Sequence, residues 1–373
     1  MPQPVSLRSQ RIQTQEEDPV EIMYARGVTD GLPVVPPTEE RVKRMLAAVD
    51  RDPQELLGTV GPNYGRATVE KVAINAVMAG CHPSYFPVVI AAASALSDEK
   101  FNTHALNVTT FSATPLTIIN GPIRQAIGVN CGHNALGHGF RANATIGRTL
   151  RLLIINIGGA KPQEITKATM GHPAQYTFCV GENEEESPWE PLHVEKGFRP
   201  DQSTVTLFGG HSPFQINDHA SRSAEQLALS IGWTMASLWN HKNFPLFSDT
   251  TLIVCPEHAK TFAQDGWSKN DLRQFLFDKI RKPFRDLRPG VNGGEGAGVS
   301  MLPMRNTPSE PPTDDTMYAK FPALDSIMII VAGGTAGRFS AAVPGLARGD
   351  AGSRITTREI QSCKEKNYGR SAT

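Results

Sequence analysis

Reactive side chains gather in one glycine-rich segment of this 373-residue chain. Cys131, His133, His138 and Arg141 place a thiol, two imidazoles and a guanidinium within eleven residues. The glycines between them allow the backbone to bend and to approach a ligand closely. A helix is predicted to begin at Asn143, and the free amide groups at a helix N-terminus attract negative charge. This segment is therefore predicted to form a site for a small anionic molecule.

Three of these side chains are of the types that bind a borderline metal ion, because zinc prefers thiolate and imidazole ligands. They are Cys131, His133 and His138. Their spacing matches none of the standard zinc patterns, and a fourth ligand would have to come from elsewhere in the chain. In the alternative interpretation, the two histidines hydrogen-bond to the loop backbone and order the turn. The cofactor stays open, with a divalent metal, zinc or iron, as the candidate.

Thiol chemistry is a second interpretation, with Cys131 or Cys81 as the nucleophile and a neighbouring imidazole, His133 in the case of Cys131, as the catalytic group that activates it. A thiolate needs a nearby positive charge or helix N-terminus, and Cys131 has both kinds of neighbour in the sequence. Cys81 directly follows an expected helix end, where the helix dipole disfavours a thiolate, and the adjacent His82 offsets this only in part. Each cysteine also has a simpler interpretation as a small buried apolar side chain.

Four polar side chains are predicted to bind the substrate. Arg141 suits a carboxylate or a phosphate because its planar fork orients the anion as well as attracting it. Asn143 stands beside it at the predicted helix start, while Asn120 ends a predicted strand and Asn183 lies in an acidic segment. Structural alternatives are that the arginine bonds loop carbonyls and that Asn143 caps the helix.

Candidate proton carriers lie in and around the acidic segment 182–186. Glu184 is expected to act as a general base, since mutual repulsion between neighbouring carboxylates raises their pKa values. The alternatives are that these glutamates are solvated or that some of them pair with Arg141 or Arg148. His193 and His211 are further candidates for proton transfer, and a structural role is the simpler interpretation of either histidine alone.

The elements that position these residues are predicted from hydrophobic periodicity and from helix caps. Helices are expected over residues 39–49, 68–80, 84–96, 143–157, 218–239 and 270–281. Apolar, β-branched runs predict strands over residues 115–119, 204–208, 251–255 and 327–332. Such strands suit burial on both faces of a sheet, with helices as crossover connections. We therefore expect an α/β fold with a mixed or largely parallel sheet flanked by helices, rich in loops.

The chain is expected to form two interlocked lobes with flexible ends. The boundaries predicted are a flexible arm over residues 1–27, an N-terminal lobe over 28–200 that carries the Cys/His segment, a C-terminal α/β lobe over 201–362 and a tail over 363–373. Residues 160–203 are expected to be irregular. The sequence contains 33 glycines and 28 prolines, which is more than usual and indicates many turns and shaped loops.

Composition excludes several classes of partner. The 37 basic and 37 acidic residues cancel, so no strong field would attract nucleic acid or a membrane surface. No apolar run reaches the roughly 18 residues of a membrane span. The five cysteines are odd in number and widely spaced, which favours reduced thiols and a cytoplasmic location. Two glycine-rich stretches, 290–298 and 333–337, lack the complete phosphate-binding patterns, so a nucleotide site is not predicted.

Four longer motifs resemble a known family. They are Asp30-Gly-Leu-Pro-Val-Val-Pro-Pro37, Ala76-Val-Met-Ala-Gly-Cys81, Arg141-Ala-Asn-Ala-Thr-Ile-Gly147 and the stretch from Glu182 to His193. Together they resemble the large uncharacterised domain of the UGSC (selenocysteine/cysteine-Gly-Ser-Cys) family, over most of residues 28–360. The resemblance implies little about the reaction. The chain departs from the family by lacking the U/C-Gly-Ser-Cys motif itself, which argues against the redox chemistry that the family name suggests.

The sequence thus predicts an enzyme that acts on a small, carboxylate-bearing metabolite by thiol- or metal-assisted lyase or hydrolase chemistry. Its pocket is expected to combine the 130–143 segment, the Cys81-His82 corner, the 182–193 segment and the turn at His211. The alternatives are a non-catalytic ligand-binding or assembly module and a thiol-dependent oxidoreductase. The expected partners are the small molecule and further copies of the chain in a homo-oligomer.

Overall fold

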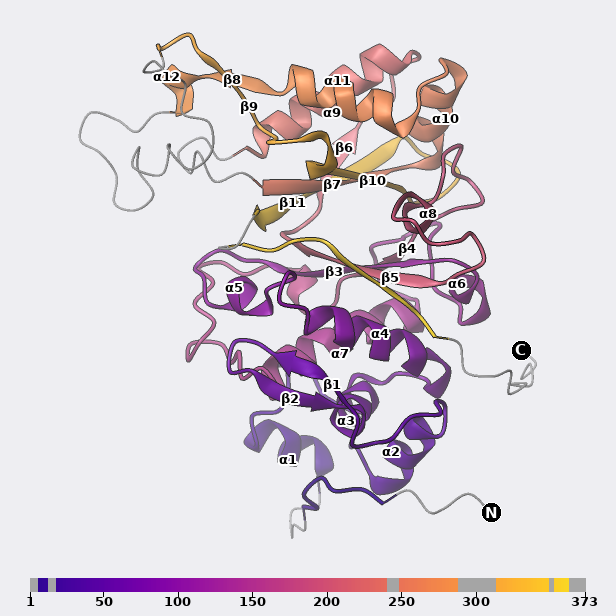
Figure 1. Ribbon diagram of the computed structural model, residues 1–373, viewed down its shortest axis with the longest axis vertical. Helices are drawn as coiled ribbons and strands as arrows, with labels where there is room; N and C mark the ends of the chain where they lie inside the picture. Colours follow the sequence, from indigo (N-terminus) through magenta and orange to yellow (C-terminus); the bar gives the residue numbers. More distant parts are fainter. Residues whose placement is uncertain (1–5, 13–17, 240–247, 288–312, 349–351, 362–373) are drawn as a thin grey trace. The chain divides into compact units, whose positions relative to one another are not determined.

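The computed structural model describes residues 6–12, 18–239, 248–287, 313–348 and 352–361. Eight strands form a large mixed sheet, with parallel and antiparallel pairs, and helices flank it (Figure 1). The predicted α/β fold class is therefore confirmed. The predicted tail and the glycine-rich stretch 290–298 lie outside the described residues, as does Cys363.

The chain divides into two compact units. Unit 1 comprises residues 1–182, 193–209 and 353–373, and unit 2 comprises residues 183–192 and 210–352. Each unit is thus built from separate stretches of sequence, and these boundaries differ from the predicted division at residue 200. Residues 193–209 join unit 1 because β5 (Thr204–Gly210) lies beside β3 (Thr114–Asn120) in the sheet.

Unit 1 contains most of the helices that the structure describes. Its longer helices are α2 (Glu39–Leu46), α3 (Val69–Ala79), α4 (Phe86–Leu96) and α7 (Arg141–Asn156). Its shorter helical segments are α1 (Pro19–Ala25), η1 (Pro83–Tyr85), α5 (Thr103–Asn107), α6 (Ile123–Ala126), η2 (Pro173–Gln175) and α8 (Leu192–Glu195), whose first residue falls in unit 2. Its strands are β1 (Leu56–Val60), β2 (Gly65–Thr68), β3, β4 (Cys179–Gly181), β5 and β12 (Thr356–Glu359).

Within unit 1, β3 pairs in parallel with β4, and β12 pairs antiparallel with β5. Every residue of β3 and β5 is buried, as expected for apolar strands covered on both faces. Helix α7 comes very close to the chain that enters β4. An added side-chain carbon at Gly147 would lie 2.7 Å from the backbone nitrogen of Phe178, so only glycine fits there.

Local signals in the sequence explain the helix boundaries in unit 1. The Thr38 and Thr68 side chains accept hydrogen bonds from Arg41 and Lys71 and thereby cap α2 and α3. Helix α3 ends at Gly80, whose φ of 90° is the left-handed conformation that favours glycine. Helix α7 begins two residues before its predicted start at Asn143, after Phe140, which provides no side-chain cap.

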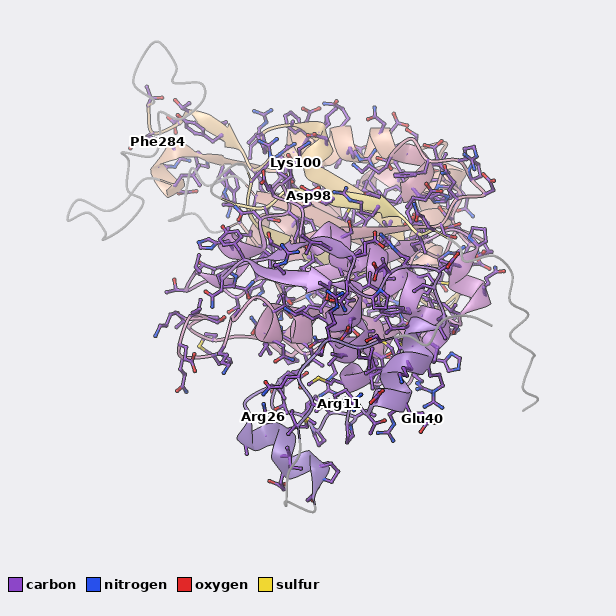
Figure 2. The ribbon with its side chains drawn as sticks, turned by 60° about the horizontal axis from the view of Figure 1, so that its bottom comes forward. Arg11, Arg26, Glu40, Asp98, Lys100 and Phe284 are labelled. Atoms are coloured by element: carbon purple, nitrogen blue, oxygen red, sulfur yellow. The ribbon has the colours of Figure 1, made fainter. Side chains whose placement is uncertain are left out.

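The chain also makes contacts before its first long helix. The backbone amides of Arg8 and Ser9 donate to the buried carboxylate of Glu70 at 2.7–3.1 Å. Arg11, labelled in Figure 2, forms an ion pair with Glu39 of α2 at 2.9 Å. The predicted flexible arm over residues 1–27 therefore includes an ordered stretch and the helix α1.

Unit 2 is a smaller α/β layer. Its helices are α9 (Ala224–Ser237), α10 (Pro256–Gln264), α11 (Lys269–Lys279), α12 (Phe284–Leu287) and η5 (Leu324–Ser326). Its strands are β6 (Phe214–Asn217), β7 (Ser248–Val254), β8 (Arg281–Pro283), β9 (Met317–Ala319), β10 (Ile327–Val331) and β11 (Phe339–Ala347). β10 pairs in parallel with β7, and β11 pairs antiparallel with β7 and β6. Helices α9, α10 and α11 bury one apolar core against these strands (Figure 1).

Candidate functional site

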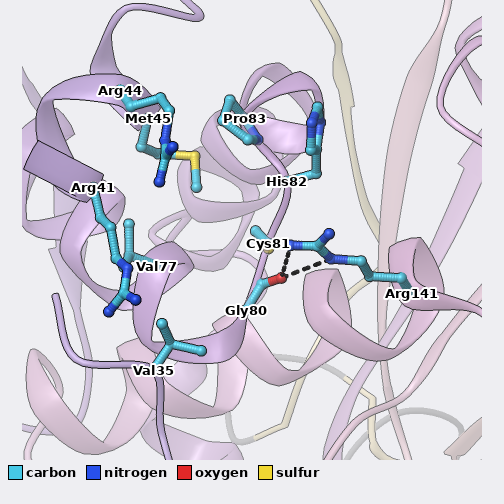
Figure 3. Close-up of a pocket in the computed structure, with 10 residues that line it drawn as sticks. All are labelled: Val35, Arg41, Arg44, Met45, Val77, Gly80, Cys81, His82, Pro83 and Arg141. Carbon is cyan, nitrogen blue, oxygen red and sulfur yellow. Dashed lines mark hydrogen bonds between the residues drawn. The ribbon is translucent and has the colours of Figure 1, made fainter. Parts of the chain in front are cut away.

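A pocket of about 320 Å³ lies in unit 1 where α2, the end of α3, η1 and the start of α7 meet (Figure 3). Three arginines line it together with a thiol, an imidazole and an apolar surface. The lining residues are Val35, Arg41, Arg44, Met45, Val77, Gly80, Cys81, His82, Pro83 and Arg141. This volume is at the small end of the range for ligand sites, so it suits a small metabolite.

Helix α2 supplies two of the three cations. Arg41 and Arg44 are three residues apart, which places them on the same side of a helix. Met45 lies beside them in the pocket wall and is only 2% exposed, so the pocket joins a charged rim to an apolar surface. The periodicity that buries Val42, Met45 and Leu46 therefore also directs the arginines to the rim.

The arginines differ in how the fold holds them. Arg141 donates from Nε and Nη2 to the carbonyl oxygen of Gly80, at 3.1 and 3.0 Å. Arg41 donates from Nη1 to the carbonyl oxygen of Pro36 at 2.9 Å. The Arg44 side chain makes no hydrogen bond or ion pair with another residue in the described part of the chain. Within those same ranges none of the three guanidinium groups is paired with a carboxylate.

The corner between α3 and η1 carries His82. Its Nδ1 accepts a hydrogen bond from the backbone amide of Ser84 at 3.3 Å, so a neutral ring carries its proton on Nε2. Burial lowers the pKa of His82, and the charges of Arg141 and Arg44 lower it further. The ring is therefore a neutral hydrogen-bond donor at the pocket, and the guanidinium groups supply the positive charge.

Cys81, a predicted nucleophile, lies in the pocket wall and is 6% exposed. Its sulfur lies 3.3 Å from the hydroxyl oxygen of Thr149. Burial raises the pKa of the Cys81 thiol, against smaller opposing effects of Thr145, Thr149 and Arg141. These surroundings favour the protonated thiol and suit a packing role.

The Asn143 side chain holds the start of the Cys/His segment, residues 130–141, by hydrogen bonds to its backbone. This side chain accepts from the backbone amide of Asn130 at 2.8 Å and donates to the carbonyl oxygens of Asn130 and Cys179 at 2.9 and 3.3 Å. Asn143 is 4% exposed. Because the amide group is used within the fold, Asn143 fixes the loop to α7 and does not have the exposure expected of a substrate ligand.

Cys131 lies at the carboxyl ends of the parallel strands β3 and β4. Its sulfur accepts a hydrogen bond from Arg124 Nη1 at 3.7 Å, and its Cβ lies against Gly181. Asn120, the last residue of β3, donates to the Glu182 carboxylate at 2.6 Å, and both side chains are fully buried. The edge formed by the carboxyl ends of parallel strands is where α/β proteins commonly bind ligands.

The reactive side chains of the segment from 130 to 141 do not share one site. Arg141 turns back to the Gly80 carbonyl and lines the pocket, whereas Cys131 lies beside Arg124. His133 and His138 are exposed and do not line the pocket. The predicted common hollow for Cys131, His133 and His138 therefore differs from the pocket observed. In the described ranges no group of three His, Cys, Asp or Glu side chains is placed to hold a metal ion.

The remaining predicted residues are distributed over both units. His193 is buried in unit 1, with Nε2 3.5 Å from the Pro200 carbonyl oxygen. In unit 2, the backbone amide of Asn183 donates to Val331 at 2.7 Å, and its side-chain amide lies 3.4 Å from the Gly333 carbonyl oxygen. Glu184 is half-buried, as is His211, whose pKa is lowered by burial. None of these four residues lines the arginine pocket.

Arg41, Arg44 and Arg124 were not predicted as functional residues from the sequence. The first two look like an ordinary basic helix face, and their spacing gives no sign that an arginine 97 residues after Arg44 lies beside them. Arg124 precedes Cys131 by seven residues and is 2% exposed. A buried arginine needs a polar partner, but its sequence neighbours do not reveal which one.

We expect Cys131 to react with iodoacetamide at least about tenfold faster than Cys81, Cys179 and Cys255, because thiol reactivity requires access. The latter three are buried, with exposures of 6%, 6% and 2%, whereas Cys131 is partly exposed. Peptide mass spectrometry after timed alkylation would measure each site separately, with Cys131→Ser as the control. Faster labelling of Cys81 would show instead that the pocket wall opens readily.

No protein-family model, no curated protein and no solved structure matches this chain significantly. The resemblance to the UGSC-family domain therefore stays a prediction from its sequence motifs. In the portion of the chain that the structure describes, no helix combines the length and hydrophobicity needed to cross a membrane.

Proposed function

We propose that this protein binds a small anionic, carboxylate-bearing metabolite in the pocket of unit 1. The observation that carries the proposal is the convergence of Arg41, Arg44 and Arg141 on one small hollow, with no carboxylate paired to them in the described ranges. Like charges brought together repel one another, so an arrangement of this kind is stabilised by an anion between them. Guanidinium groups match the geometry of a carboxylate through two parallel N–H donors.

Alternatives to a bound anion explain this pocket less well. Ordinary surface arginines extend into solvent or pair with neighbouring acids, as Arg199 does with Asp201 at 3.0 Å. By contrast, Arg41 and Arg141 are oriented by bonds to backbone carbonyls, which reduces the side-chain entropy that ligand binding would otherwise cost. This preorganisation supports a binding site.

Thiol-assisted lyase or hydrolase chemistry on a small carboxylate-bearing metabolite, at a second site outside the arginine pocket, is the second function that we propose. Its support is the site at Cys131, a partly exposed residue whose sulfur accepts a hydrogen bond from the Arg124 guanidinium and whose Cβ lies against Gly181, next in sequence to the buried Glu182. A sulfur in contact with a cation is the surrounding expected of a nucleophilic cysteine. If the protein only binds its ligand, the arginine pocket is sufficient without Cys131.

The first test is direct binding of small anions by isothermal titration calorimetry at low ionic strength. We expect Arg44→Gln to weaken the affinity of the best-binding carboxylate at least about tenfold, since one charge-assisted contact is lost. Arg44 is the preferred site because its side chain makes no bond that the described fold would lose. Added salt should weaken binding to the wild type, because the rim of the pocket is exposed.

The matched control for this test is Arg66→Gln. Arg66 is an exposed arginine of β2 outside the pocket, so this variant changes the net charge by the same amount. Equal weakening by Arg44→Gln and Arg66→Gln would mean that only net charge matters and would contradict the pocket as the site. Turnover of a carboxylic acid by the wild type and its loss in Cys131→Ala would support a thiol-assisted reaction at the Cys131 site, which is separate from the arginine pocket.

A further inference from the structure

The pocket holds its two anchored arginines on different sides. Arg41 comes from α2 and is fixed by the Pro36 carbonyl, and Arg141 comes from the first turn of α7 and is fixed by the Gly80 carbonyl. Figure 3 shows the two side chains on opposite sides of the segment that carries Gly80 and Cys81. Each guanidinium keeps N–H groups that the backbone contact does not use, so each can hold its own anionic group.

An apolar surface lies between these two cations. Val35 and Val77 lie next to the Arg41 side chain, and Met45 forms the adjacent wall (Figure 3). Met45 and Val77 are 2% and 5% exposed and Val35 is 37% exposed, so this apolar surface runs from the buried wall of the pocket to its mouth. A ligand that spans the pocket would therefore place carbon atoms, and not charge, against its middle.

The backbone at the pocket disfavours a single, dense anion such as phosphate. Phosphate sites are commonly built from backbone amides at a helix N-terminus. Here the backbone facing Arg141 is the C-terminus of α3, where the carbonyl of Gly80 presents partial negative charge. His82 is neutral, so it adds a hydrogen-bond donor to the pocket but no positive charge.

From these three features we infer that the pocket binds a dicarboxylate, in which two carboxylates are joined by a short hydrocarbon chain. One carboxylate pairs with Arg41 and the other with Arg141, and the chain between them lies against Val35, Met45 and Val77. Arg44 makes a further charge-assisted contact with a carboxylate at the open rim, and His82 donates to one carboxylate oxygen. This inference rests on the anion site proposed above and specifies its ligand class.

A calorimetric series tests the ligand class. Succinate, glutarate and adipate vary the distance between two carboxylates, while butyrate carries one carboxylate and inorganic phosphate carries one compact anionic group. We expect the best dicarboxylate to bind at least about tenfold more tightly than butyrate and phosphate, because a second charge-assisted pair forms. We also expect affinity to depend on chain length, since only one spacing reaches both arginines.

Variants assign each carboxylate to its arginine. Arg41→Gln and Arg141→Gln should each lower the affinity of the best dicarboxylate to about that of butyrate for the wild type, and Arg66→Gln should not. Because both arginines also bond the backbone, Arg41→Lys and Arg141→Lys are measured in parallel, with circular dichroism as a check on folding. Each lysine keeps the charge and loses the fork, so an intermediate affinity is expected.

The outcomes separate the two proposals. Butyrate or phosphate binding as tightly as every dicarboxylate would overturn the dicarboxylate inference and leave the anion site standing. Loss of affinity in only one of the two glutamine variants would also overturn it, because the second carboxylate would then have no arginine. No measurable binding of any anion by the folded wild type would overturn both proposals.

Discussion

Replacing Asp30 by asparagine should lower the free energy of opening of α7 by about 3 kcal/mol, because it breaks a buried ion pair from one side. Arg148 of α7 donates from Nε and Nη2 to the two carboxylate oxygens of Asp30, each at 2.8 Å. The Asp30 side chain is 2% exposed and that of Arg148 is 16% exposed. The asparagine would leave the guanidinium buried without a counter-charge, and this costs more than the loss of one hydrogen bond.

The same contact fixes the segment that leads into the pocket. Arg148 Nη2 also donates to the carbonyl oxygens of Leu32 and Pro33, at 3.1 and 2.9 Å. Arg148 thus ties Asp30, Leu32 and Pro33 of the proline-rich stretch to α7, and Val35 of the pocket lies two residues after Pro33. We therefore expect Asp30→Asn to weaken anion binding as well as to destabilise α7.

Native-state hydrogen exchange measured by mass spectrometry is the suitable readout for Asp30→Asn. All four tryptophans, Trp189, Trp233, Trp239 and Trp267, belong to unit 2, so fluorescence does not report directly on α7. The control is Asp201→Asn, which breaks an exposed ion pair with Arg199. The Asp201 side chain is 73% exposed and the Arg199 side chain is 68% exposed. Such exposed ion pairs contribute little to the free energy of unfolding. Unchanged exchange of α7 in Asp30→Asn would show that the pair does not hold this region together.

The sequence predicts a helix or strand well when the residues that determine its ends lie within or beside that element. Helices α2 and α3 were predicted to within a few residues, because Thr38, Thr68 and Gly80 encode their ends within the elements themselves. Strand β4 fell in a region expected to be irregular, since its three residues are too few to show a periodic pattern. Strand β11 was also missed, because Pro344 and Gly345 interrupt it and are unfavourable in strand interiors.

The candidate site was predicted only in part for a related reason. The sequence indicated an anion site involving Arg141 and the Cys81-His82 corner, and these residues do line one pocket. It also grouped Arg141 with Cys131, His133 and His138 because they are close along the chain. Proximity in sequence does not set the direction of a side chain, and the Gly80 carbonyl draws Arg141 away from that group. The contribution of α2 depends on tertiary packing, which residue spacing does not encode.

The stability of unit 2 should depend on pH through a buried lysine, Lys320, which is 3% exposed. Burial lowers the pKa of Lys320 from 10.5 to about 8, although the nearby Asp249 opposes this change. The ammonium group lies 4.6 Å from the centre of the Phe321 ring and 3.4 Å from the Thr250 hydroxyl oxygen. These partners do not replace the hydration that the charge loses, so the folded state disfavours the protonated form.

The sign of the effect follows from the lowered pKa. Above pH 10.5 the lysine is neutral in the folded and unfolded states and carries no penalty. As the pH falls from 10.5 towards 8, the unfolded chain binds a proton before the folded chain does, so the free energy of unfolding decreases by about 3 kcal/mol. Asp249 acts in the opposite direction at lower pH. Burial raises the pKa of Asp249 from 3.8 to about 6. The stability that its protonated form contributes is therefore present below pH 3.8 and is lost as the pH rises through 6.

Lys320→Met should remove the dependence on pH between 8 and 10.5, because methionine fills similar space without a titrating group. Urea unfolding followed by tryptophan fluorescence reports on this change, since all the tryptophans lie in unit 2. The difference between wild type and variant at each pH isolates the lysine from other groups that titrate in both proteins. Lys260→Met is the control, because the Lys260 side chain is 55% exposed. A difference curve that stays flat from pH 8 to 10.5 would mean that Lys320 keeps an ordinary pKa in the folded protein, and hence that its ammonium group remains hydrated.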